Sequence, residues 1–161
     1  MKNFNQKTRK IIPTIILILV FSNINAQNNI NDSAKVASTL KELLIICRSV
    51  DFADPNTTSL GTFYKAAPYI IYRGDDKKRA WKDYANYKNT TEKEGVDNVC
   101  YKINSTINQD TNYTITGYEK NTESEGVWHI LLIEYVRKGE KKKIAFAFLF
   151  VKNRFGLGDI D

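Results

Sequence analysis

The single histidine of the chain, His129, is the residue best suited to acid–base chemistry. An imidazole titrates near neutral pH, so it can act as general acid or base when a polar partner lies close by. Asp159 is the carboxylate that the expected strand pairing brings to the same sheet face. The two groups could flank a small molecule in a proton-transfer reaction. A lone histidine on an apolar strand is also the pattern of a packed core residue, and this alternative stays open.

A pocket on that face would have an aromatic and aliphatic floor. Its predicted lining is His129, Leu131, Phe146, Phe148, Phe150 and Asp159. A run dense in charged and aromatic residues supplies a predicted rim at Tyr72, Arg73 and Trp81. The alternative for this run is a solvated helix start with one buried tryptophan.

The two cysteines, Cys47 and Cys100, fall on the apolar faces of two expected helices. They could form a disulfide between the helices, remain buried free thiols, or act as a reactive thiol; the structural alternatives are preferred. One histidine and two cysteines exclude a His-rich or Cys-rich metal centre. The sequence has no phosphate-binding glycine loop, His-Glu-x-x-His, Cys-x-x-Cys or Gly-x-Ser-x-Gly motif. We therefore expect no metal and no cofactor.

Helices are expected in the first part of the domain. Apolar residues recur at three- and four-residue spacing from Val36 to Val50, which predicts a helix with one buried face. A shorter helix is predicted over Thr57–Ala67, ended by Pro68, with Tyr69–Tyr72 extended after it. Another is predicted from Asp75 through Tyr87. A last helix opens at Thr90 or Thr91 and carries apolar residues through Ile107 on one face.

Alternating residues after Asp110 predict four successive strands. They are Tyr113–Lys120, Val127–Lys138, Lys141–Lys152 and Phe155–Ile160. We predict α+β architecture, with N-terminal helices packed on a curved, cone-like C-terminal antiparallel sheet of about four strands.

The first long hairpin has a turn that would fix its register. Gly139 at the first central position predicts a two-residue type II′ turn between Lys138 and Lys141. That register places Leu131 opposite Phe148.

A second two-residue turn is predicted at Asn153-Arg154. It would place Asp159 opposite Phe148, on the same face as His129. Two strand spacings and a two-residue offset then separate the Cα atoms of His129 and Asp159 by roughly 12 Å.

Residues 1–26 have the order of a secretory signal: a basic start, the apolar run Ile11–Phe21, and a polar stretch that ends in Ala26. As a helix the apolar run would be about 16 Å long, against a hydrocarbon core of about 30 Å, so cleavage after Ala26 is preferred to a membrane anchor. Residues 27–31 form a polar tether, and residues 32–161 a single domain. No membrane span is expected after cleavage, and the expected location is the periplasm or exterior of a Gram-negative bacterium.

The basic excess belongs largely to this leader. The chain has 24 Lys and Arg against 18 Asp and Glu, and four of the basic residues precede residue 28, where no acid occurs. The remaining 20 against 18 exclude the clustered positive charge typical of nucleic-acid-binding domains.

The order of leader, helices and antiparallel strands resembles the nuclear transport factor 2-like superfamily. The C-terminal run Phe155–Asp161 also resembles the tails of small exported proteins of Gram-negative bacteria. The resemblance implies a curved sheet around an apolar pocket, in a superfamily that includes ketosteroid isomerases, dehydratases and non-enzymatic binding modules. No catalytic residue of those enzymes is carried over, and fold alone does not establish activity.

Three functions remain, and the first is preferred. The first is an exported binding or accessory domain for a small apolar ligand or a protein partner. The second is a self-associating envelope component, such as a homodimer formed through the sheet. The third is a proton-transfer enzyme using His129 and a carboxylate, so the balance is against an enzyme.

Overall fold

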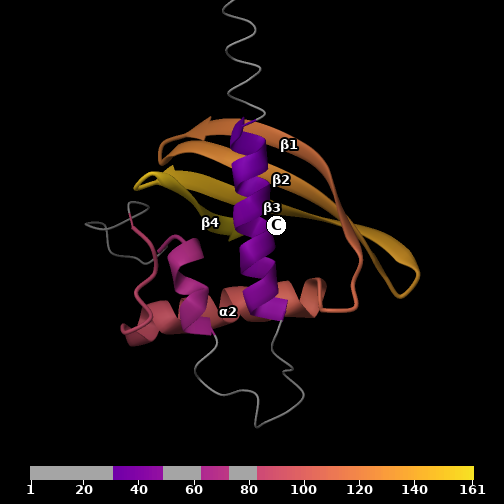
Figure 1. Ribbon diagram of the computed structural model, residues 1–161, viewed down its shortest axis with the longest axis horizontal. Helices are drawn as coiled ribbons and strands as arrows, with labels where there is room; N and C mark the ends of the chain where they lie inside the picture. Colours follow the sequence, from indigo (N-terminus) through magenta and orange to yellow (C-terminus); the bar gives the residue numbers. More distant parts are fainter. Residues whose placement is uncertain (1–30, 49–62, 73–82) are drawn as a thin grey trace, which may run out of the picture. The chain divides into compact units, whose positions relative to one another are not determined.

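The computed structural model describes residues 31–48, 63–72 and 83–161 (Figure 1). The chain divides into two compact units, Met1–Ala34 and Lys35–Asp161. Within the first unit, residues 31–34 are described and are helical. The predicted signal segment 1–26 and the tether up to residue 30 lie outside the described residues. Among the described helices, none has both the length and the apolar character needed to cross a bilayer.

The second unit has helices followed by a sheet, which confirms the predicted α+β class. Residues 35–48 continue the first helix. The later elements are η1 (Phe63–Lys65), η2 (Ala67–Tyr69), α2 (Thr90–Thr106), β1 (Tyr113–Glu123), β2 (Gly126–Arg137), β3 (Glu140–Val151) and β4 (Arg154–Ile160). The strands are antiparallel and lie side by side in chain order, so the sheet is open rather than closed into a barrel (Figure 1).

The predicted helix from Asp75 to Tyr87 is wrong in the part that the structure describes, because residues 83–87 are not helical. Tyr84 instead forms an antiparallel bridge with Ile71, and Ile70 forms a parallel bridge with Leu157 of β4. These bridges satisfy backbone groups at the β4 edge that a helix would have left to water. Pro68 also differs from expectation, since it lies inside the short helix η2.

The turn between β2 and β3 is one residue earlier than predicted. Its central residues are Lys138 and Gly139, with φ of 52° and 79°, and Arg137 lies opposite Glu140. Positive φ at both positions is the type I′ geometry, whose twist matches that of the strands. The predicted register set Lys138 opposite Lys141, and like charges directly opposite one another are destabilising.

The observed register therefore differs by two residues from the predicted one. Leu131 lies opposite Phe146, not Phe148, and His129 lies opposite Phe148. Because side chains alternate with a period of two, the shift changes partners and leaves every side chain on its predicted face.

The turn between β3 and β4 also differs from its prediction. Lys152 and Asn153 are the central residues, with φ of 48° and 64°, and Val151 lies opposite Arg154. The predicted turn at Asn153-Arg154 is wrong, because Arg154 is already the first residue of β4 and pairs with Val151.

Strand β4 contains an irregularity that changes the face of one acid. Leu157 lies opposite Phe148, but Asp159 lies opposite Ala147, with a register shift between these pairs at Gly158. Ala147 and Phe148 project to opposite faces, so Asp159 lies on the face away from His129. The predicted pairing of Asp159 with Phe148 is wrong. The earlier turn alone would have placed Asp159 opposite Phe146, still on the face of His129, and the extra residue then moves it to the other face.

One core joins the helices to the sheet. The fully buried residues include members of the first helix, α2 and one face of the sheet: Val36, Leu40, Leu43, Val96, Cys100, Ile103, Leu131, Ile133, Phe146 and Phe148. A disulfide links Cys47 of the first helix to Cys100 of α2 within this core, with an S–S distance of 2.06 Å. The two helices are therefore covalently fixed against each other as well as packed.

Candidate functional site

A pocket of about 350 Å³ lies between α2 and β4, and we call it the α2–β4 pocket. Three parts of the chain line it: α2, the end of β4, and the bridged segments around Ile70 and Ala85. The lining residues are Ile70, Ile71, Tyr72, Ala85, Thr91, Glu92, Gly95, Val96, Asn98, Val99, Lys102, Leu157, Gly158, Asp159 and Ile160. The size falls within the range of small-molecule sites, and the walls are mainly aliphatic.

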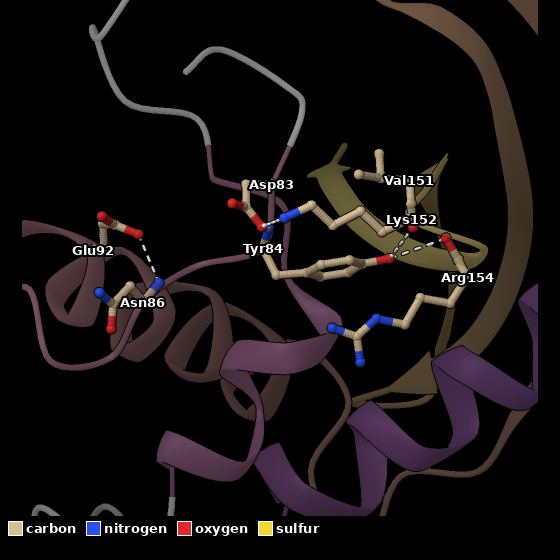
Figure 2. A network of polar contacts seen from close by, with 7 residues as sticks. All are labelled: Asp83, Tyr84, Asn86, Glu92, Val151, Lys152 and Arg154. Atoms are coloured by element: carbon tan, nitrogen blue, oxygen red, sulfur yellow. Dashed lines mark hydrogen bonds and ion pairs between the residues drawn. The ribbon is translucent and has the colours of Figure 1, made fainter. Parts of the chain in front are cut away.

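Capping hydrogen bonds fix the N-terminus of α2, which lines the pocket. Asn89 is the N-cap, and its Oδ1 accepts from the backbone N–H of Glu92 at 3.2 Å. The Glu92 carboxylate in turn accepts from the backbone N–H of Asn86 at 2.6 Å (Figure 2). Glu92 is buried, and the first turn of a helix favours a negative charge. The carboxylate thus has a structural role as well as a place in the pocket wall.

Backbone hydrogen bonds attach the facing wall to β4. Ile71 N–H donates to the carbonyl of Leu157 at 2.7 Å, and Ala85 N–H donates to the carbonyl of Ile70 at 2.9 Å. Tyr72 N–H donates to the carbonyl of Asp83 at 3.0 Å. The wall therefore continues the sheet beyond β4, and its position follows from the strand pairing.

Tyr84 fastens this wall to the β3–β4 turn. Its hydroxyl lies 3.0 Å from the carbonyl oxygens of both Val151 and Arg154 (Figure 2). The Arg154 guanidinium stacks on the ring at 3.9 Å, and Lys152 forms an ion pair with Asp83 at 2.8 Å. Burial raises the pKa of Tyr84 above its ordinary value near 10. The tyrosine therefore keeps its proton, and its hydrogen bond, throughout the neutral range.

Gly156 allows this wall to approach the strand closely. A Cβ atom at this position would lie 2.6 Å from both Ile71 Cδ1 and Tyr84 Cε1. Any side chain larger than hydrogen would push the wall away from β4.

Gly95, in the middle of α2, differs from Gly156 because a side chain there would have space. A Cβ atom at Gly95 would meet nothing within 4 Å, and the residue lines the pocket. Glycine inside a helix costs about 1 kcal/mol relative to alanine. Gly95 is exposed, and no close packing accounts for that cost, so a side chain here would enter the open space beside the pocket.

Three charged groups line the pocket. Glu92 and Asp159 supply carboxylates, and Lys102 supplies an ammonium group whose Nζ donates to the carbonyl of Ile160. The Asp159 carboxylate accepts from the N–H of Ile160 at 2.9 Å. Among the lining residues that the structure describes, the formal charges are thus two negative and one positive.

His129 lies elsewhere, in the core beneath the sheet. It is 5% exposed, its Nδ1 lies 2.7 Å from the Tyr118 hydroxyl, and its ring meets Phe155 edge-on at 4.7 Å. It does not line the α2–β4 pocket, and the structure does not bring it together with Asp159. This environment is that of a packed core residue, which is the alternative that the sequence left open for His129.

The other predicted pocket residues are divided between core and surface. Leu131, Phe146 and Phe148 are fully buried, whereas Phe150 is 53% exposed. Tyr72 and Asp159 do line the α2–β4 pocket. Arg73 and Trp81 lie outside the described residues.

The described lining offers two carboxylates and one ammonium group as its charged side chains. Within the described lining no histidine, cysteine or serine occurs, and Glu92 is held by the helix cap. The described parts of the chain also contain no group of three or more His, Cys, Asp or Glu side chains able to hold a metal ion. Sequence reasoning missed Gly95, Glu92 and Lys102; a glycine in the middle of an otherwise regular helix was the signal that could have located the site.

Comparison of the chain with family models, curated proteins and solved structures gives no match.

Proposed function

We propose that this protein is a small exported binding domain that holds an apolar ligand in the α2–β4 pocket. The observation that carries the proposal is the combination of aliphatic walls with a helix glycine, Gly95, that leaves the pocket open. Apolar ligands gain about 0.8 kcal/mol for each methylene group that they bury, so such walls can supply useful affinity.

Export after cleavage behind Ala26 is part of the proposal, to the periplasm or exterior of a Gram-negative bacterium. Its support is the order of charges and apolar residues in the leader, together with the Cys47–Cys100 disulfide. Disulfides persist in oxidising compartments and are rare in the cytosol. The resemblance to the nuclear transport factor 2-like superfamily is part of the same proposal, since that superfamily includes binding modules.

The test compares two leucine substitutions on α2. Gly95→Leu places a side chain in the pocket, whereas Glu94→Leu adds the same group at an exposed neighbouring position outside the lining. The probe is N-phenyl-1-naphthylamine, an uncharged dye that fluoresces in apolar surroundings. Loss of two buried methylene contacts corresponds to about a tenfold weaker Kd, so Gly95→Leu should weaken dye binding by at least that factor.

Glu94→Leu should bind the dye within about twofold of the original protein, as surface substitutions have small effects. Equal dye binding by the original protein and by Gly95→Leu would refute the proposed pocket. Native mass spectrometry of protein purified from its own host would then identify a retained ligand, if the dye result supports the site.

A further inference from the structure

One face of the sheet carries an apolar area outside the core. The area consists of four residues of β2 and β3, which we call the outer patch: Ile130, Leu132, Ala145 and Ala147. They alternate along their strands with fully buried residues such as Leu131 and Phe146, so they project to the face away from the core. Each is only partly buried, and none of them belongs to the core or to the hydrophobic residues that pack against it.

The register of β2 and β3 separates the large side chains of the outer patch from the small ones. Ile130 lies opposite Ala147, and Leu132 lies opposite Ala145. The branched side chains therefore form a ridge along β2, and the alanines leave a shallow groove along β3. Adjacent strands are about 4.8 Å apart, so the ridge and the groove lie side by side on one face.

A two-fold axis parallel to the strands, between β2 and β3, makes this face complementary to itself. The axis lays β2 of each copy over β3 of the other, and the same patch is used on both copies. Near the axis each β2 residue then faces, on the second copy, the residue that it pairs with in its own sheet. Ile130 faces Ala147 of the second copy, and Leu132 faces Ala145. Large side chains thus meet small ones, as sheets require when they pack about 10 Å apart with nearly aligned strands.

The charges nearest the axis are complementary in the same arrangement. Glu134 lies opposite Lys143 within the sheet, so the axis places Glu134 of each copy over Lys143 of the other. Glu134 also forms an ion pair with Lys141 at 2.9 Å, and its two carboxylate oxygens can accept from both ammonium groups. Farther from the axis, Glu119 of β1 approaches Asp159 of the second copy, which limits the affinity.

The size of the face sets the strength of the pairing. Four rows of outward side chains, from that of Ile130 to that of Val136, span about 27 Å along the strands and about 14 to 19 Å across them. Two copies would bury roughly 800 to 1,000 Å², which is below the standard size of a specific complex. Going beyond ligand binding, we propose that two copies of this protein associate through the outer patch as a weak, reversible homodimer, with a Kd of about 100 µM.

Sedimentation velocity of protein purified from its own host tests this proposal, at concentrations from about 10 µM to about 1 mM. The original protein should change from monomer to dimer across this range. Glu134→Lys and Lys143→Glu each replace two attractions by two repulsions, so each should weaken association by about tenfold or more. Combining them restores opposite charges and should return the Kd to within about threefold of the original.

Two further variants complete the test. Glu94→Lys makes the same change in charge at an exposed position of α2, away from the sheet, and should leave the Kd within about twofold. Leu132→Ala lowers the ridge in both copies and should weaken association by about tenfold. It decides the question if circular dichroism shows that the charge variants do not fold.

Three results would overturn the proposal. The first is a protein that stays monomeric at about 1 mM. The second is a dimer that neither Glu134→Lys nor Leu132→Ala weakens, because association then uses another face. The third is a dimer that the combined charge exchange fails to restore, because the two copies then do not share the axis between β2 and β3.

Discussion

Replacing Gly156 with alanine tests how the pocket wall is attached to the sheet. The added Cβ would lie 2.6 Å from Ile71 Cδ1 and from Tyr84 Cε1, which is closer than nonbonded carbon atoms approach. Ile71 can respond because its Cδ1 is the end of a flexible chain. Tyr84 cannot do so cheaply, since its hydroxyl is bonded to the carbonyls of Val151 and Arg154. We therefore expect the tyrosine to carry most of the cost.

The expected loss of stability can be estimated from the interactions that the Tyr84 ring would lose. Displacing Tyr84 costs about 1 kcal/mol for its hydrogen bonding, and a further 0.5 to 1 kcal/mol, roughly, for the Arg154 guanidinium stacked at 3.9 Å. Residual overpacking adds about 1 kcal/mol. Alanine restricts the unfolded chain more than glycine does, and this returns about 0.5 to 1 kcal/mol. The free energy of unfolding should therefore fall by about 2 kcal/mol, and Tm by about 6–10 °C.

Urea and thermal unfolding followed by circular dichroism measure this change, with Gly95→Ala as the matched control. A Cβ at Gly95 meets nothing within 4 Å, so that substitution should stabilise the protein by about 1 kcal/mol. In a Tyr84→Ala background Gly156→Ala should cost at least 1 kcal/mol less, roughly, than in the original protein. A loss below about 0.5 kcal/mol in the original protein would mean that the ring does not restrain the wall as described.

Two further predictions concern the restraints on the same domain. Tyr84→Phe should lower the free energy of unfolding by about 1 kcal/mol at neutral pH. Because burial raises the pKa of Tyr84 above 10, the stabilisation is complete below pH 10 and is lost as the pH rises through the raised pKa. The difference from Tyr84→Phe should therefore shrink above pH 10 in urea titrations, and a difference that stays constant there would contradict the assignment. Replacing both Cys47 and Cys100 with alanine opens a loop with a sequence separation of 53 and should cost about 4 kcal/mol; a cost below about 1 kcal/mol would show that packing alone fixes the two helices.

The sheet was largely predictable from sequence, because the alternation of apolar and polar residues along a strand shows which side chains share a face of the sheet. Strand order, antiparallel pairing and the buried face of Leu131 and Phe146 follow from a period of two. The residue pairs across the β2–β3 hairpin could not be predicted in the same way. Gly139 suits both the first central position of a type II′ turn and the second central position of a type I′ turn. The charge pattern contained the missing information, since only the observed register sets Arg137 opposite Glu140.

The pocket was not predictable, since it depends on contacts between distant segments. Ile70 meets Leu157 of β4, and Ile71 meets Tyr84, through isolated bridges that leave no periodic pattern in the sequence. The shift at Gly158 then moves Asp159 to the face opposite His129, and a single extra residue of this kind has no reliable sequence signal. The proton-transfer chemistry expected of His129 and Asp159 required both side chains on one face of the sheet. The shift at Gly158 places them on opposite faces.

The two glycines of the pocket region favour a candidate site beside β4 over one beneath the sheet. At Gly156 the absence of a side chain is used for close packing, so substitution there acts on stability. At Gly95 no atom uses the space, and the helix gives up about 1 kcal/mol that alanine would restore. Departures from the most stable local choice are expected where a binding site needs them. Beneath the sheet, by contrast, Phe146 and Phe148 are fully buried, and His129 is held by Tyr118 and Phe155. A ligand entering there would have to displace packed side chains, whereas along α2 the chain already leaves it room.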